Sequence, residues 1–128
     1  MSDGCLADAC AIIAFFADGG ASMTETGIAA MQRDVAISPI TVWELARKAS
    51  IGKLPPLPTV AGSFTRWLAE QGFRLQPLTW ADTERATALP PIHKDPMDRM
   101  LIAQALNAAM PVITEDGLYR QYGVTTVW

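Results

Sequence analysis

HKDPMDRMLIAQA, residues 93–105, contains a helix start that decides how the rest of the chain can be arranged. Asp95 followed by Pro96 is typical of a helix N-terminus, where a carboxylate caps the first turn and proline takes the first helical position. Asp98 then falls in the first turn, and apolar residues recur at helical spacing through residue 109. Two aspartates are therefore predicted at the positive end of a largely buried helix, although capping alone would also explain them.

The composition of the 128 residues predicts one globular domain spanning residues 1–128. Half of the residues are hydrophobic and 18% are charged, which argues against a disordered chain. The net charge of −3 gives no overall basic character that would indicate nucleic-acid binding. That argument weakens if four acids hold metal, because the remaining side chains then comprise 10 basic and 9 acidic residues.

No segment has the pattern of a membrane anchor or a secretion signal. The longest apolar run, residues 9–17, is too short to span a bilayer, and the N-terminus carries Asp3 without Lys or Arg. We therefore expect a cytoplasmic protein with no membrane association. Cys5 and Cys10 are expected to be reduced thiols, and a single histidine without a CxxC motif argues against zinc.

Short apolar strands alternate with helices along the chain. The sequence predicts strands at residues 5–8, 35–37, 73–78, 110–114 and 124–127. It predicts helices at residues 9–17, 23–33, 40–51, 59–71, 80–88 and 96–109, with a single turn or short helix at 118–121. Pro77 makes the third strand an edge. This alternation favours an α/β fold, with a parallel sheet of four to five strands and helices on both faces.

Four carboxylates are predicted to meet beyond the carboxyl ends of these strands, where open α/β sheets bind ligands. Asp8 ends the first strand, and Glu44 lies about two turns into the helix after the second strand. Asp98 begins the helix that leads into the fourth strand, and Asp116 follows that strand within two residues.

Two of these acids also have purely structural explanations. Asp8 could simply cap the helix that follows it. Glu44 could pair with Lys48 four residues later, or form a capping box with Thr41.

Carboxylates gathered at one site raise one another's pKa unless cations neutralise them. Oxygen ligands without His or Cys favour Mg²⁺ or Mn²⁺, which activate water and stabilise charge on a phosphodiester. The sequence has no convincing catalytic triad and no glycine-rich phosphate loop. His93, the only histidine, is expected to be a loop residue or an indirect contact to the site rather than a catalytic base.

Asp8 after a strand, SPITVWELARKASIGKL at residues 38–54, HKDPMDRMLIAQA at 93–105 and VITED at 112–116 together resemble a PIN domain. The similarity is greatest to the VapC-like ribonuclease toxins of type II toxin–antitoxin modules, and it covers nearly the whole chain in order. It implies a Mg²⁺- or Mn²⁺-dependent endoribonuclease that cleaves RNA, is inhibited by a cognate protein antitoxin, and is usually a homodimer.

The resemblance also implies roles for individual residues. The four catalytic acids would be Asp8, Glu44, Asp98 and Asp116. All of these except Glu44 would be metal ligands. Thr114 would hydrogen-bond the site, Asp95 would cap its helix without binding metal, and Arg99 would contact a carboxylate or a phosphate.

The chain departs from the family pattern in three places, one of which is an N-terminus without the longer hydrophobic strand that is typical of the family. Such proteins usually place Thr or Ser directly after the first Asp, whereas Ala9 and Cys10 follow here. A hydroxyl near the metal would therefore be missing, with weaker support for the ion. Glu115 adds a fifth acid, whose role the sequence does not assign.

Basic side chains in or beside these motifs are candidates for RNA contact through phosphates. They are Arg47, Lys48, Lys53, Lys94 and Arg120. An ordinary solvated surface would account for any one of them equally well.

Two other functions were weighed against the nuclease. A phospho-acceptor receiver domain needs an Asp at the end of its third strand and a Lys after its fifth. Residues 73–78 contain no Asp, and no Lys follows residue 94, so this function is disfavoured. A catalytically inactive PIN-fold binding module remains the alternative, because Ala9 replaces the expected hydroxyl residue.

Overall fold

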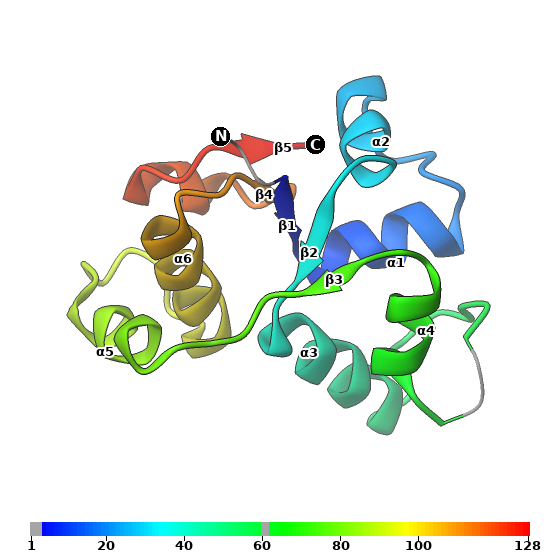
Figure 1. Cartoon of the computed structure of the whole chain (residues 1–128), viewed down its shortest axis with the longest axis horizontal. Helices are drawn as coiled ribbons and strands as arrows, with labels where there is room; N and C mark the ends of the chain where they lie inside the picture. Colours follow the sequence, from blue (N-terminus) through cyan, green and yellow to red (C-terminus); the bar gives the residue numbers. More distant parts are fainter. Residues whose placement is uncertain (1–3, 60–61) are drawn as a thin grey trace.

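Five short parallel strands form the centre of the computed structural model, which describes residues 4–59 and 62–128 (Figure 1). The strands are β1 (Cys5–Ala7), β2 (Val35–Ile37), β3 (Arg74–Leu75), β4 (Val112–Ile113) and β5 (Thr126–Val127). They lie in the order β3-β2-β1-β4-β5. The predicted α/β class with a parallel sheet is confirmed, and β3 is an edge strand as predicted.

Six α-helices and one 3₁₀-helix surround the sheet in the described part of the chain (Figure 1). They are α1 (Ala9–Ala17), α2 (Glu25–Met31), α3 (Pro39–Ser50), α4 (Phe64–Glu70), α5 (Trp80–Ala88), α6 (Pro96–Ala108) and η1 (Gly117–Tyr122). Helices α5 and α6 lie on one side of the sheet, and α1, α2 and α4 lie on the other. No helix in the described part of the chain is long and apolar enough to cross a membrane.

The helix predicted at residues 59–71 is shorter in the structure. It begins only after Ser63, whose side chain accepts a hydrogen bond from the Arg66 backbone N–H. Gly62 just before it has φ of +82°, a left-handed conformation that a right-handed helix does not contain. The predicted helix also included residues 60 and 61, which fall outside the described residues.

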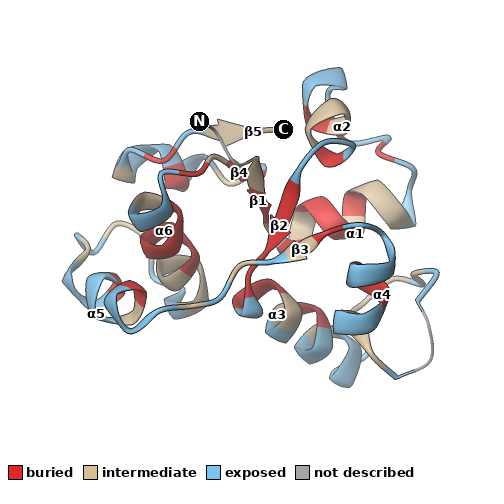
Figure 2. Ribbon diagram, in the orientation of Figure 1, coloured by how far each residue is buried: buried red, intermediate tan, exposed pale blue. Residues whose placement is uncertain are grey.

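The sheet residues alternate between two hydrophobic clusters, one on each face (Figure 2). The first core cluster includes Ala7, Ile37 and Ile113 from the strands, packed with α1, Leu45 of α3 and Trp67 of α4. The second core cluster includes Leu6, Ala36 and Val112, packed with Leu101 and Ile102 of α6 and Tyr119 of η1. Burial on both faces explains why the strands are apolar without polar alternation.

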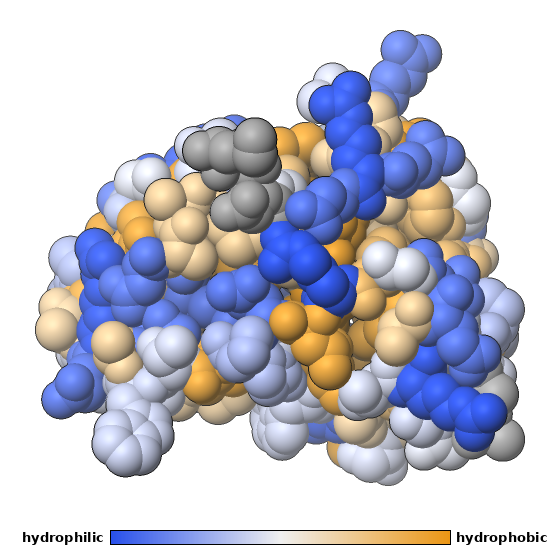
Figure 3. Space-filling view, in the orientation of Figure 1, coloured by the Kyte–Doolittle hydropathy of each residue, from blue (hydrophilic) through white to orange (hydrophobic). Residues whose placement is uncertain are grey.

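The edge strand is the more open part of this architecture. Leu75 of β3 is half exposed, and the surface in Figure 3 is hydrophobic near its centre, where β3 lies, with hydrophilic residues on either side. Pro77 follows β3 and lacks a backbone N–H, so the predicted strand at residues 73–78 reduces to two paired residues.

The chain adds β2 and β3 on one side of β1 and then crosses over to add β4 and β5 on the other side. The carboxyl ends of the neighbouring parallel strands β1 and β4 therefore lie at a topological switch point. Their register pairs Ala7 with Ile113, so Asp8 and Thr114 emerge side by side. The buried Thr41 hydroxyl of α3 donates a 2.9 Å hydrogen bond to the Ala7 carbonyl. This bond ties the start of α3 to the end of β1.

Replacing Thr41 by Val should lower the free energy of unfolding by about 1 kcal/mol, because the substitution keeps the shape of the side chain but removes the hydrogen bond to Ala7. Urea denaturation measures the effect. Thr87→Val is the matched control, because the exposed Thr87 hydroxyl bonds only within α5, to the Glu84 carbonyl. Equal losses in the two variants would contradict the anchoring role of Thr41.

Candidate metal centre

Asp8 is the residue that joins β1 to α1. Its Oδ1 accepts the Ala9 N–H at 2.7 Å and thereby caps α1, while its Oδ2 accepts the Thr114 hydroxyl at 2.9 Å. Burial raises the pKa of Asp8, the hydrogen bonds from Thr114 and Ala9 lower it, and the nearby Asp116 raises it again. Asp8 is therefore both a helix cap and a half-buried carboxylate of the candidate site.

Cys10 supplies a donor where a hydroxyl was expected to be missing. Its Sγ lies 3.4 Å from Asp8 Oδ2 and 3.6 Å from Thr114 Oγ1. Burial, followed by the charge of Asp8, raises the pKa of the Cys10 thiol to about 12, so the thiol keeps its proton and donates. Although Ala9 has no hydroxyl, Asp8 still receives hydrogen bonds from two side chains, those of Thr114 and Cys10.

Asp116 begins η1 after β4. Its backbone N–H donates to Thr114 Oγ1 at 3.1 Å, and its Oδ1 caps η1 by accepting the Leu118 N–H at 2.9 Å. Its second oxygen, Oδ2, lies 2.7 Å from His93 Nε2. The Thr114 hydroxyl thus connects the segments of Asp8 and Asp116.

Asp98 lies in the first turn of α6, which Asp95 caps through hydrogen bonds from Met97 N–H and Asp98 N–H. The hydroxyl of the fully buried Tyr119 donates to Asp98 Oδ1 at 2.6 Å. Burial, with Asp8 and Asp95 as further causes, raises the pKa of Asp98 to about 6 despite the bond from Tyr119. Burial and the neighbouring carboxylates raise the pKa of Tyr119 itself, so this hydroxyl remains a donor.

Glu44 adopts neither structural arrangement that its position in α3 would allow. The cap of α3 is Ser38, whose Oγ accepts the Ile40 N–H, and Thr41 bonds to β1 instead. Within residues 4–59 and 62–128, Glu44 forms no ion pair with Lys48. Burial and then the charge of Asp8 raise the pKa of Glu44, which indicates that its carboxylate faces the other acids.

All four predicted acids line one open pocket of about 450 Å³. Its charged lining residues are Asp8, Asp18, Glu44, Lys48, Asp95, Asp98, Glu115 and Asp116. Glu115, the unassigned fifth acid, is thus a pocket residue. Lys48 is the basic residue among these lining side chains.

Two sets of three side chains within this region bring potential metal ligands within 4.8 Å of one another. One set is Glu44, Asp95 and Asp98, and the other is His93, Asp98 and Asp116. Asp98 belongs to both. Asp8 belongs to neither among the described residues, so the predicted ligand set of Asp8, Asp98 and Asp116 is not the most compact one, and Asp95 is a cap that also lies within ligand range.

Arg99 contacts backbone carbonyls in the described structure rather than a site carboxylate, and its predicted contact with a phosphate stays a prediction. Its guanidinium donates to the carbonyls of Ala86, Leu89 and Pro90 at 2.8–2.9 Å and to that of His93 at 3.4 Å. Arg99 therefore fixes the end of α5 and the loop that follows it. A planar fork of donors suits several carbonyl acceptors at once, and this local arrangement could not be read from the position beside Asp98.

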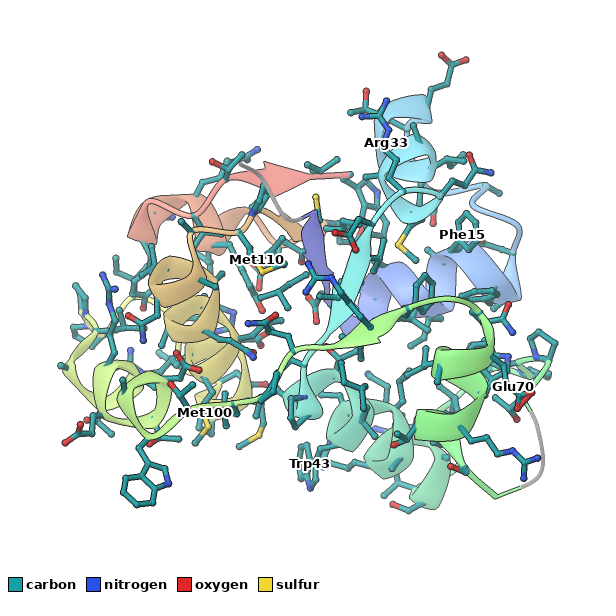
Figure 4. All side chains as sticks on the ribbon, in the orientation of Figure 1. Phe15, Arg33, Trp43, Glu70, Met100 and Met110 are labelled. Carbon is teal, nitrogen blue, oxygen red and sulfur yellow. The ribbon has the colours of Figure 1, made fainter. Side chains whose placement is uncertain are left out.

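The basic residues proposed for RNA contact are dispersed around the pocket. Lys48 lines it, whereas Arg47 stacks 5.8 Å from the ring centre of Trp43, which projects outward from α3 (Figure 4). The others are exposed and are not pocket-lining: Lys53, Lys94 and Arg120.

Tyr119 and His93 contact the acids, although the sequence predicted no role for Tyr119 and only an indirect one for His93. The one sequence signal for Tyr119 is its spacing three residues after Asp116, which places it inside the turn that Asp116 caps. Both residues contact acids more than 20 positions away in sequence, so their roles depend on tertiary structure.

Two solved structures illustrate the similarity of this fold to known proteins. A toxin–antitoxin complex from Klebsiella pneumoniae has a chain that is 21% identical, with a TM-score of 0.57 over 88% of this chain and 87% of that chain. A structure of FitAB bound to an IR36 DNA fragment has a chain that is 18% identical, with a TM-score of 0.57 over 94% of this chain and 92% of that chain. At these identities the likeness establishes the fold.

The comparison by sequence gives a family but no individual relative. No curated protein matches the chain. The family described as PIN domain matches residues 5–124, which is nearly the whole chain. The chain therefore belongs to the PIN-domain family.

Proposed function

We propose that this PIN domain is the toxin of a type II toxin–antitoxin pair and acts as a Mg²⁺- or Mn²⁺-dependent endoribonuclease. The observation that carries the proposal is the position of Asp98, which lies within 4.8 Å of potential ligands from two separate sets of side chains. The titles of the two structural neighbours, which name a toxin–antitoxin complex and FitAB, support the toxin assignment.

The side chains present fit a hard divalent cation. Glu44, Asp95, Asp98 and Asp116 offer carboxylate oxygens from three elements, and Lys48 is the one basic side chain among the pocket-lining residues. Burial and the charges of Asp8 and Asp95 raise the pKa values of Glu44 and Asp98, even though Lys48 and Arg47 lower the first and Tyr119 and His93 lower the second. A bound cation would neutralise these carboxylates.

Individual residues would then have distinct tasks. When bound, a divalent cation lowers the pKa of water and stabilises negative charge on a phosphodiester. Tyr119 would hold Asp98 in orientation through Oδ1, and Thr114 and Cys10 would hold Asp8. Glu44, with its raised pKa and its place on the pocket wall, would accept a proton at a carboxylate oxygen from the attacking water.

Partners follow from the same proposal. The substrate is RNA, contacted through phosphates by Lys48 at the pocket and by neighbouring basic side chains. The inhibitor is a cognate protein antitoxin, and the active assembly is a homodimer. An antitoxin that places a basic side chain in the acidic pocket would lose affinity when Asp8 and Asp98 are neutralised.

Asp98→Asn should abolish cleavage of a mixed RNA pool, because the substitution removes the carboxylate that both ligand sets share. Purified wild type should cut in Mg²⁺ or Mn²⁺ and not in chelator, and we expect at least about a 100-fold loss in the variant. Glu84→Gln is the matched control, because it makes the same charge change at an exposed position of α5.

Cleavage that survives in chelator, or that Asp98→Asn retains at the level of Glu84→Gln, would contradict the metal-dependent nuclease. An absence of cleavage in all proteins, together with metal binding that Asp98→Asn does not change, would favour the inactive PIN-fold binding module.

Asp98→Asn should also stabilise the metal-free protein at neutral pH. The pKa of Asp98 is about 6 in the folded protein, compared with about 3.9 for an unfolded chain, so the folded state binds the proton more tightly. Stability of the wild type therefore falls as pH rises from about 4 to about 6, and the ionised carboxylate remains unfavourable above that range. Asn carries no charge and avoids this cost.

With allowance for solvent screening, we expect the variant to be more stable by about 1–2 kcal/mol at pH 7.5 and nearly equal at pH 4. Urea denaturation in chelator at both pH values measures the difference, and Mg²⁺ should then stabilise the wild type but not the variant. A difference that does not change with pH would show that Asp98 ionisation is not the cause.

A further inference from the structure

The imidazole of His93 lies between two carboxylates of the proposed metal centre. Its Nε2 is 2.7 Å from Asp116 Oδ2 and 3.5 Å from Asp98 Oδ2, and only 11% of the side chain is exposed. The ring also meets that of Tyr119 edge to face, at 6.1 Å between centroids. The position of His93 is therefore defined by contacts on several sides.

The other ring nitrogen identifies the tautomer. The Asp95 backbone N–H donates to His93 Nδ1 at 3.2 Å, so Nδ1 is an acceptor and carries no proton. Nε2 is then the ring nitrogen that carries a proton, which it donates to Asp116 Oδ2. If His93 bound a metal ion through Nε2, its proton would have to lie on Nδ1, where it would point at the Asp95 N–H.

The loop that carries His93 is held by side chains outside the pocket. The Tyr122 hydroxyl accepts the Ile92 N–H at 3.0 Å and the His93 N–H at 2.7 Å, and it donates to the Pro90 carbonyl at 2.7 Å. Arg99, which lies in α6, also donates to the Pro90 carbonyl, at 2.9 Å. Tyr122 and Arg99 thus fix the backbone of His93 through its N–H and its carbonyl.

We propose that His93 is a positioning residue, which holds Asp116 toward Asp98 as an Nε2–H donor and does not bind the metal itself. The inference rests on the proposed function, because it takes Asp98 and Asp116 as ligands of the ion. Residues that orient metal-binding side chains in this way typically change metal affinity by about 10- to 100-fold when they are removed. His93 would therefore set the affinity of the site without entering the coordination sphere.

The test compares Mn²⁺ binding by the full chain with binding by His93→Ala and His93→Gln. Calorimetry should show a loss of about tenfold or more for His93→Ala. His93→Gln should recover most of that loss, because its amide N–H can reach the place of Nε2–H. Pulsed electron paramagnetic resonance of the bound Mn²⁺ should show no ¹⁴N coupling from a directly bound imidazole. Melting of the metal-free proteins establishes that each variant is folded.

Three results would overturn the inference. These are a ¹⁴N coupling that disappears in His93→Ala, a His93→Gln variant that binds as weakly as His93→Ala, and a His93→Ala variant that binds like the wild type. Asp98→Asn and Glu84→Gln are measured alongside. If both Asp98→Asn and His93→Ala bind Mn²⁺ like the wild type, the proposed metal centre itself is wrong. If Asp98→Asn loses Mn²⁺ binding and His93→Ala does not, only the proposed role of His93 is wrong.

Discussion

The carboxylate of Asp8 is half-buried at the end of the central strand, where a negative charge is unfavourable unless hydrogen-bond donors reach it. Those donors come from different parts of the chain: the Ala9 N–H and Cys10 thiol from α1, and the Thr114 hydroxyl from the end of β4. The pairing of Ala7 with Ile113 brings them together. The register of two strands therefore supplies the Thr114 hydroxyl, which lowers the pKa of Asp8 against the effect of burial, and the other acids are arranged around Asp8.

Helix capping and ligand binding are compatible at this edge of the sheet, because a carboxylate has two oxygens. Asp8 caps α1 with Oδ1 and turns Oδ2 toward Thr114. Asp116 caps η1 with Oδ1 and turns Oδ2 toward His93. Asp95 caps α6 with Oδ1 and still lies within ligand range of Glu44 and Asp98. The sequence left open whether Asp8 caps a helix or serves the site. In the structure one oxygen caps α1 and the other remains available to the site, so the two explanations are compatible.

Local signals in the sequence were sufficient for most of the fold. The Asp95-Pro96 and Ser38-Pro39 pairs mark the starts of α6 and α3, because capping depends on neighbouring residues only. The sequence likewise predicted that the four acids would meet at one edge, and all four line one pocket. Helix α4 is shorter than the predicted helix at residues 59–71, because the spacing of apolar residues does not indicate that Gly62 has a left-handed backbone conformation.

Side-chain partners far apart in sequence were not predictable in the same way. Arg99 is adjacent to the site in sequence but points its guanidinium at the carbonyls of residues 86–90. Tyr119 and His93 reach the acids only because η1 and the loop before α6 pack together in the folded chain. These contacts depend on which face of each element is turned inward, and no residue spacing within a single motif contains that information.

The two core clusters give the acidic pocket a part in the cooperativity of the molecule. Asp8 and Glu44 extend from α1 and α3, whose buried side chains Ile12 and Leu45 belong to the first core cluster. Asp98 extends from α6, and its partner Tyr119 belongs to the second. A local opening that separates either face from the sheet would also pull the acids apart. A cation bound between these acids would therefore oppose partial unfolding on both faces of the sheet. Amide hydrogens on the two sides would then become protected from hydrogen exchange together.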